Sequence, residues 1–229
     1  MTPLRVLQDE VQTCRRCAHG STRTQTVFAK GDPLSPLCFV GEAPGEEEDA
    51  QGIPFVGDSG KLLDKQIAAM REYTATQGIA FPADPYVCNV LKCRPPGNKL
   101  LKDGSDIAAC SEHLWAQLRA LPNLRVIVAL GKTAAQTLLQ TDAPIGKLRG
   151  KTIEMLCPLV ARRAEPGRDV RSYILARLGC KALGGIETLL PVFFVVPTYH
   201  PAYLLRQPNN KELSREVWAD LKRAVEALR

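Results

Sequence analysis

The sequence predicts an α/β protein in which helices cover both faces of one parallel sheet. Four short apolar runs alternate with helical patterns along the chain, at residues 37–40, 86–91, 124–130 and 192–196. Strands of a parallel sheet are buried on both faces, so they form continuous apolar runs of this kind. The alternation of strands with helices indicates a sheet with helical layers on either side.

Capping residues and apolar spacing mark the helices. Pro3 opens a first helix that runs toward Cys14. Ser59 is expected to cap a helix after the first strand, and further helices are predicted over residues 105–121 and 132–139. The closing helix is amphipathic, and its apolar face repeats at helical spacing through Leu213, Val217, Leu221, Val225 and Leu228.

The chain length predicts a single domain. A chain of 229 residues can bury one substantial core, so we expect one domain over residues 1–229. The first ten residues include Arg5, Asp9 and Glu10 without a long apolar run, which predicts neither a signal peptide nor a membrane span. We therefore expect a cytoplasmic monomer that does not bind membranes.

The positive charge of the chain is concentrated in one segment. Residues 147–181 contain nine basic and three acidic residues, which accounts for the whole formal net charge of +6. A basic block of this kind favours a polyanionic partner, nucleic acid first. The alternative, a solvated face that keeps the protein soluble, stays open at this point.

Polar residues collect where the predicted strands end. Residues 41–57 follow the first strand and combine glycines and prolines with a run of carboxylates and with Phe55. Asn89 lies at the end of the second strand, and His200 follows the last one. Open α/β sheets bind ligands at the carboxyl ends of their strands, so we expect these residues to surround one ligand site.

Residues 131–133 are candidate phosphate contacts. Gly131, Lys132 and Thr133 stand between the third strand and its helix, where backbone N–H groups at a helix start can meet a phosphate. The upstream glycine of a Walker loop is absent, so a nucleotide-binding P-loop is not predicted.

Four of the eight cysteines form a candidate metal site. Cys14 and Cys17 are separated by two residues, and Cys93 and Cys110 follow later in the chain. Four thiolates can hold either a structural zinc ion or an iron–sulfur cluster, and the spacing does not separate the two. The other cysteines are interpreted as small apolar residues that pack inside, namely Cys38, Cys88, Cys157 and Cys180.

Four motifs and these four cysteines together resemble a known family. The motifs are GEAPG at 41–45, PFVG at 54–57, NVLKCRPPGN at 89–98 and HPAYLL at 200–205. In order and spacing they resemble the iron–sulfur uracil-DNA glycosylases, called family 4. The match spans roughly residues 2–150 and 192–228.

The resemblance implies a three-layer α/β/α fold with a four-stranded parallel sheet. It implies a [4Fe-4S] cluster on Cys14, Cys17, Cys93 and Cys110, and DNA containing uracil as the partner. The implied reaction hydrolyses the N-glycosidic bond of deoxyuridine and leaves an abasic site for base excision repair. The chain departs from the family at residues 151–190, a basic insertion where family members usually cross in far fewer residues.

The resemblance also assigns roles around a flipped base. Phe55 would stack on uracil, a contact worth roughly 1–3 kcal/mol, and Asn89 would pair with its N3–H and O4. His200 would donate to O2, where charge develops as the bond breaks. Glu42 is the first choice to position the attacking water, with Glu48 as an alternative on the same loop.

The remaining predicted contacts lie around this pocket. Ala43 and Asn98 are expected to contact the substrate, and Leu204 or Leu205 could wedge into the gap left by the flipped base. Arg206 is expected to contact DNA. Three further acids of the first loop are interpreted as solvated loop charges or as charges near a helix N-terminus, namely Glu46, Glu47 and Asp49.

Two other functions remain possible on these residues. One is a protein of the same fold that binds uracil-containing or abasic DNA without turnover. Relatives that bind irreversibly carry a histidine in the loop after the cysteine strand, and residues 97–102 lack one. The other is an α/β metalloprotein that acts on nucleotides or redox partners. No residue of the sequence identifies the wall that would exclude thymine.

Overall fold

The computed structural model describes residues 2–156 and 192–229, which form a five-stranded sheet between two layers of helices. The strand order is β2-β1-β3-β5-β4. Strands β2, β1, β3 and β5 run parallel to one another, and the edge strand β4 pairs with β5 in the antiparallel direction. The strand bounds are β1 Leu37–Gly41, β2 Tyr86–Asn89, β3 Val126–Leu130, β4 Ile153–Leu156 and β5 Val192–Thr198.

The fold class and the three layers are confirmed, whereas the strand count of four is wrong. The additional strand, β4, lies at the start of the segment interpreted as an insertion. It is an edge strand with an exposed glutamate, Glu154, so it lacks the continuous apolar run that marks the central strands. The remainder of the insertion, with most of its basic residues, lies outside the described residues.

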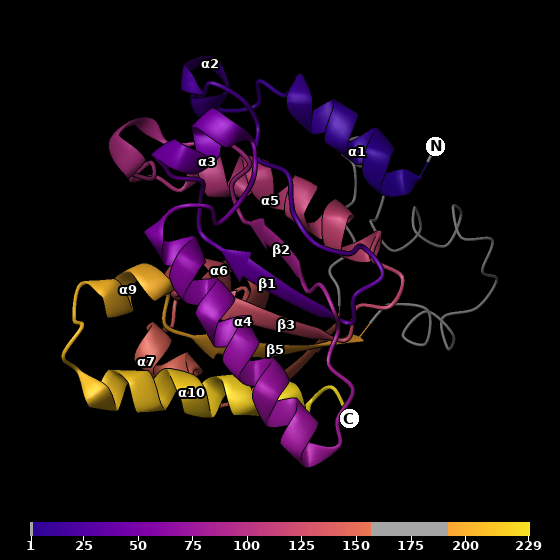
Figure 1. The fold of residues 1–229 in the computed structure, drawn as a ribbon. Helices are drawn as coiled ribbons and strands as arrows, with labels where there is room; N and C mark the ends of the chain where they lie inside the picture. The colour runs from indigo at the N-terminus through magenta and orange to yellow at the C-terminus, as the bar shows by residue number, and fades with distance from the viewer. Residues whose placement is uncertain (1, 157–191) are drawn as a thin grey trace.

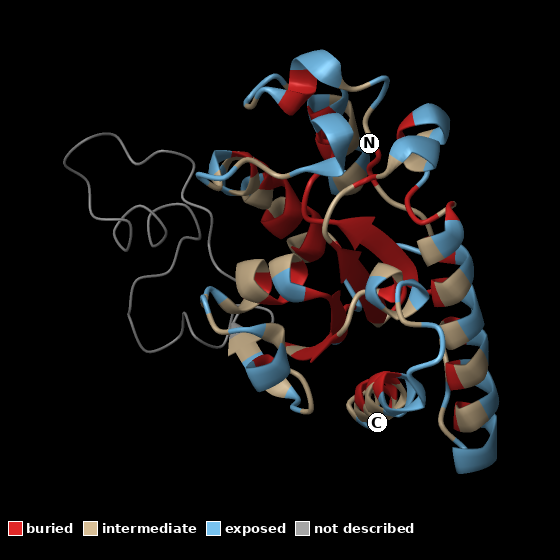
Figure 2. Ribbon diagram, turned by 90° about the vertical axis from the view of Figure 1, so that its left-hand side faces the viewer, coloured by how far each residue is buried: buried red, intermediate tan, exposed pale blue. Residues whose placement is uncertain are grey.

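The two faces of the sheet are covered by different helices. One face packs against α5 Ser105–Arg119, α6 Lys132–Leu139 and α7 Ile145–Leu148. The other packs against α4 Asp58–Gln77 and α10 Lys211–Glu226; in Figure 1, α4 crosses in front of the sheet and α10 runs below it. Alternate strand residues enter the two cores, as the pleat requires. Figure 2 shows the sheet between them as an almost wholly buried layer.

Short helices connect these layers. They follow α1 Pro3–Gln12 and comprise α2 His19–Thr22, α3 Glu46–Gln51, the 3₁₀ turn η1 Pro96–Asn98 and α9 Pro201–Leu205. Thr2 caps α1 and Asn210 caps α10, each through a side-chain oxygen that accepts a backbone N–H. None of the helices in the described ranges is long and apolar enough to cross a membrane.

The parallel strands end level with one another. Gly41 at the end of β1 pairs in register with Asn89 of β2, and Leu130 of β3 pairs with Thr198 of β5. The four following loops therefore leave the sheet along one edge, and they carry most of the predicted site residues.

A buried carboxylate anchors the end of β5. Asp220 on α10 is fully buried and accepts hydrogen bonds from Thr198 Oγ1 (2.9 Å), Arg149 Nε (3.1 Å) and the Gly150 N–H (3.0 Å). The network joins α10, the end of α7 and the strand that leads to His200.

We expect Asp220→Ala to lower the free energy of unfolding by about 3–5 kcal/mol, because it leaves Arg149 and Thr198 without their shared acceptor in a buried region. Urea denaturation followed by circular dichroism measures this loss. Glu212→Ala, at an exposed position of the same helix, should cost less than about 1 kcal/mol. Equal losses in the two variants would contradict the structural role of Asp220.

Candidate functional site

A cavity of about 300 Å³ lies at the carboxyl ends of the parallel strands. Its lining includes all seven residues predicted from the sequence as catalytic or substrate-binding: Glu42, Ala43, Glu48, Phe55, Asn89, Asn98 and His200. These residues come from four separate segments of the chain. The structure therefore brings these residues together around one cavity.

Asn89 presents an unused acceptor at this cavity. Its side chain is buried, and its Oδ1 has no hydrogen-bond partner within the described residues. Gly41 allows this arrangement, because a Cβ there would overlap both the Asn89 oxygen and the Phe55 ring. A buried acceptor without a partner is costly, so this oxygen is available to accept a hydrogen bond from the N–H group of a ligand.

Phe55 is held in an uncommon backbone conformation. Its φ is +54°, in the left-handed region that bulky residues rarely adopt. Its carbonyl accepts from Lys30 Nζ at 3.0 Å, and Gly60 lies so close to that carbonyl that a Cβ would overlap it. Strain of this kind is retained at binding sites. It aims the Phe55 ring at the cavity, 5.8 Å from the His200 ring at 28°.

The tautomer of His200 follows from its position at a helix start. Its Nδ1 accepts from the Ala202 N–H at 3.1 Å and so caps α9. The proton of the neutral ring is then on Nε2. Burial, with the nearby charge of Arg206, lowers the pKa of His200 to about 4. At neutral pH the ring is therefore an uncharged Nε2–H donor.

Glu42 is oriented by a residue from a different strand end. Its Oε2 accepts a hydrogen bond from the Thr133 hydroxyl at the start of α6. Its own carbonyl accepts from the Leu91 N–H at 3.0 Å, which fixes the backbone after β2 beside it. The carboxylate is therefore held at the cavity without being enclosed by the protein.

Glu48 is committed to the protein backbone. Its Oε1 accepts from the N–H groups of Val56 (3.0 Å) and Gly57 (2.9 Å), and its Oε2 accepts from that of Gly45 (3.0 Å). It thereby joins the two halves of the loop that forms the cavity floor. This geometry favours a positioning role over contact with the attacking water.

The interpretation of the neighbouring acids as charges near a helix N-terminus is confirmed, whereas that of a solvated loop acid is wrong for Asp49. Residues 46–51 form the helix α3. Asp49 is buried and accepts from the Thr24 N–H through both oxygens, at 3.1 and 3.0 Å. Glu46 pairs with Arg94 at 3.0 Å. Nothing in the sequence indicated these contacts, because the partners Thr24 and Arg94 lie far from the acidic run along the chain.

Arg94 links the two rims of the cavity. Besides Glu46 it donates from Nε to Asn98 Oδ1 at 3.0 Å. Asn98 has a φ of +57° within η1 and lines the cavity. The guanidinium therefore joins the loop after β2 to the loop after β1, and sequence reasoning missed it.

The predicted phosphate contacts after β3 need correction. The Gly131 N–H donates to the Thr198 carbonyl at 2.8 Å and is not available to a phosphate. Gly131 instead allows close packing, because a Cβ there would lie 2.9 Å from the His200 Cβ. The Thr133 hydroxyl binds Glu42. Only Lys132 of the three is exposed at the surface.

The two candidate wedge leucines lie in different environments. Leu204 packs partly buried against the core of α4 and α10, whereas Leu205 is 44% exposed. Tyr203 beside them is 37% exposed and lies 5.8 Å from the Arg206 guanidinium. Tyr203, Leu205 and Arg206 are therefore the exposed residues at the end of α9.

The four predicted cysteine ligands line a second, smaller cavity, together with Arg23, Lys92 and His113. Two N–H donors and one histidine ring nitrogen approach their sulfur atoms. Arg23 Nη1 lies 3.1 Å from Cys93, the Lys92 backbone N–H lies 3.3 Å from Cys110, and His113 Nε2 lies 3.4 Å from Cys14. His113 is buried in this site.

Four cysteines around one cavity fit either a single zinc ion or an iron–sulfur cluster. Within the described ranges, no three or more His, Cys, Asp or Glu side chains are arranged to hold one metal ion. N–H groups next to the sulfur atoms stabilise thiolates in either kind of centre. Burial raises the pKa of Cys93, and that of Cys110 to about 11.

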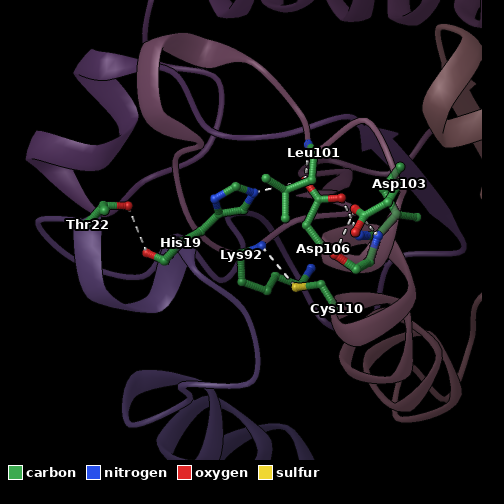
Figure 3. A network of polar contacts seen from close by, with 9 residues as sticks. His19, Thr22, Lys92, Leu101, Asp103, Asp106 and Cys110 are labelled. Atoms are coloured by element: carbon green, nitrogen blue, oxygen red, sulfur yellow. Dashed lines mark hydrogen bonds and ion pairs between the residues drawn. The ribbon is translucent and has the colours of Figure 1, made fainter.

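A buried hydrogen-bonded pair joins the segments that carry the cysteines. His19 Nε2 lies 2.8 Å from Asp106 Oδ2, and both side chains are buried. Asp106 also accepts from the Leu101 N–H at 2.9 Å, as Figure 3 shows beside Cys110. The pair thus connects the helix after Cys17 to the start of α5.

Cys38 and Cys88 pack in the core as predicted, and Cys157 and Cys180 lie outside the described residues.

Comparison with known proteins agrees with this site. Residues 28–222 match the family model described as "Uracil DNA glycosylase superfamily". The chain is 36% identical over 222 residues to the type-4 uracil-DNA glycosylase of Thermotoga maritima, covering 96% of this chain and 92% of that protein. It is 33% identical over 211 residues to that of Archaeoglobus fulgidus, covering 89% and 83%.

A type-5 uracil-DNA glycosylase from Thermus thermophilus is 32% identical over 117 residues, only 48% of this chain. The type-4 similarity thus spans nearly the whole chain, including the segments that carry the four cysteines. By its sequence and its strand-end site, the chain belongs to the uracil DNA glycosylase superfamily.

Proposed function

We propose that the protein is a uracil-DNA glycosylase, which extrudes uracil from DNA and hydrolyses its N-glycosidic bond. The observation that carries the proposal is the unpartnered, buried Oδ1 of Asn89 in a cavity lined by Phe55 and His200. A glycosylase must take its base out of the stack into such a pocket, at a cost of a few kcal/mol. The abasic site it leaves would enter base excision repair.

Asn89 supplies the selection for uracil. Its Oδ1 accepts from the N3–H of uracil, and its amide group donates to O4. Cytosine presents an acceptor and a donor in the opposite order, so it would leave buried groups unpaired. Mismatches of this kind can give discrimination of about 10⁴-fold. Phe55 supplies the stacking surface beneath the base.

His200 stabilises the leaving group. As the glycosidic bond breaks, negative charge develops on the uracil ring and its O2. A neutral Nε2–H donor fixed by the α9 cap stabilises that charge more in the transition state than in the bound substrate, which is the requirement for catalysis. The ring needs no protonation for this role.

Glu42 acts on the other side of the broken bond. Its carboxylate, oriented by Thr133, positions the attacking water and offsets the positive charge that develops on the sugar. Glu48 maintains the loop that carries both Glu42 and Phe55. The presence of a base and an oxyanion donor in one cavity favours turnover over binding without reaction.

DNA would contact the exposed surface around the cavity. Leu205 fits the gap left by the flipped base, with Arg206 and Lys132 near the phosphates. Cys14, Cys17, Cys93 and Cys110 would hold a [4Fe-4S] cluster that ties the N-terminal arm to the segment after β2. We place the enzyme in the cytoplasm as a monomer.

A single-uracil oligonucleotide tests the proposed activity. Incubation followed by alkali should break the strand at the uracil, in a uracil·guanine duplex or in single-stranded DNA. No breakage on either substrate would refute the enzyme. Purified protein should be brown and contain iron and sulfide; a colourless protein fully loaded with zinc would refute the cluster.

The pH dependence of the reaction follows from His200. Its folded pKa of about 4 lies below the usual 6.5, so the neutral donor persists as the pH falls. We expect kcat/KM to show no His200 titration at 6.5 and to fall only as the pH approaches 4. In the unfolded chain this histidine takes up its proton near pH 6.5. Its contribution to the free energy of unfolding is therefore lost as the pH falls from 6.5 to about 4.

Arg206→Gln should move the acid limb of the rate profile to higher pH, because the nearby charge helps to lower the pKa of His200. Profiles of kcat/KM from pH 4 to 9 for both proteins test this. An acid limb near pH 6.5 in the wild-type profile that disappears in His200→Asn would contradict the lowered pKa of His200.

A further inference from the structure

Lys92 is a charged side chain that the proposed mechanism does not use, although it lies beside the site. It follows β2 directly, three residues after Asn89, and its side chain is 1% exposed. Its Nζ donates to the Asn89 carbonyl at 2.6 Å and to Gln117 Oε1 at 2.5 Å. Lysine is almost never fully buried unless it is paired.

The orientation of Gln117 is determined by its other bonds. Its Nε2 donates to the Phe28 carbonyl at 3.2 Å and to the Tyr86 hydroxyl at 2.9 Å. Both amide hydrogens are therefore engaged, and Oε1 turns toward Lys92. The ammonium group is thus held at one place between β2 and α5, and the Asn89 carbonyl is held with it.

Both oxygen partners of Lys92 Nζ are formally neutral. Removing an ammonium group from water costs several kcal/mol unless an opposite charge compensates it. The cysteine site is one nearby candidate, because Lys92 lines that cavity and its backbone N–H contacts Cys110 Sγ at 3.3 Å, as Figure 3 shows. Four thiolates around a zinc ion or a [4Fe-4S] core carry a net negative charge.

We propose that Lys92 is a positioning residue that couples the two sites: its ammonium group fixes the backbone of Asn89 and takes its counter-charge from the metal centre on the four cysteines. The proposal rests on the proposed function for its first half, and on the cysteine site for its second. It gives the metal centre a physical connection to uracil recognition, through one side chain.

Two variants separate the two halves. Lys92→Met keeps the side-chain length and removes both the charge and the bond to Asn89. Gln117→Glu keeps Lys92 and supplies a carboxylate, to which the Tyr86 hydroxyl can donate, as an alternative counter-charge. Lys65→Met removes an exposed lysine of α4 and serves as the control.

The metal centre is measured by its release of iron or zinc to a chelator and by its midpoint potential. We expect Lys92→Met to release metal at least tenfold faster. Both variants should shift the midpoint potential of a cluster to more negative values. Each reduces the positive charge near the cluster, and that charge stabilises the reduced form. An unchanged potential and release rate in both variants would overturn the counter-charge. Should Lys92→Met not fold, Gln117→Glu alone decides this half.

Uracil recognition is measured by single-turnover rates with saturating enzyme, which do not depend on the folded fraction. Lys92→Met should lower the rate on uracil about tenfold, and Gln117→Glu should stay within about twofold of the wild type. A Lys92→Met protein with the wild-type rate would overturn the positioning role. If the wild type does not cleave uracil, the proposed function fails, while the metal measurements still test the counter-charge.

Discussion

Replacement of His200 by alanine is expected to lower kcat for uracil excision by about 10²–10³-fold, with little change in DNA affinity. The loss corresponds to the removal of one preorganised donor to a developing oxyanion, about 2.7–4 kcal/mol. The donor acts mainly in the transition state, so the effect appears in kcat and not in KM. Single-turnover kinetics and a binding titration with uncleaved DNA measure the two quantities separately.

Alanine also removes the cap of α9, because Nδ1 of His200 accepts the Ala202 N–H. His200→Asn is the matched variant, since asparagine is a strong N-cap but has no ring Nε2–H. We expect His200→Asn to keep the stability of the wild type and to lose activity as His200→Ala does. If either variant retains a rate within tenfold of the wild type, His200 is not the donor.

The central sheet was predictable because burial on both faces leaves only apolar residues in a strand. Strands β1, β2, β3 and β5 were found this way, whereas the edge strand β4 carries an exposed glutamate and gives no such run. Strand ends were less certain. The strand β5 continues through Pro197 and Thr198, because its last residues pair with the end of β3.

The site was predictable to the extent that it follows from strand ends and local motifs. Asn89 ends a buried strand, and Glu42 and His200 come within two residues of the end of one, so topology alone brings them together. Lys92 and Arg94 follow β2 shortly after Asn89. Nothing in the sequence, however, distinguishes a buried lysine from an exposed one. Their roles depend on partners from α5 and α3, which only tertiary packing supplies.

The structure also separates two carboxylates that the sequence left as alternatives. Glu48 has both oxygens bonded to backbone N–H groups, and such bonds hold a carboxylate in place. Glu42 has a hydroxyl on Oε2 from Thr133, which leaves Oε1 for a water molecule. A catalytic base needs orientation together with a free lone pair, and of the two this description fits Glu42 better.

Asn89→Ala should lower kcat/KM for uracil by about 10³-fold, because N3–H and O4 of the bound base lose their partners in a buried pocket. Each buried group left unpaired costs roughly 1–3 kcal/mol. The preference for uracil over cytosine should fall as well, since the residue that distinguishes the two bases is gone. Rates on matched oligonucleotides that carry uracil or cytosine at one position measure both effects.

The same substitution should leave the fold intact, which separates recognition from stability. Asn89 Oδ1 already lacks a partner in the described structure. Alanine removes this unpaired buried oxygen, which is favourable, and leaves a small void, which is unfavourable. The free energy of unfolding should therefore stay within about 1 kcal/mol of the wild type. Asn123→Ala, which removes an exposed amide bonded to Leu34 far along the chain, is the control. Full activity on uracil in Asn89→Ala would exclude Asn89 as the selecting residue. A large loss of stability would mean that the unpaired oxygen is held for the fold and not for a ligand.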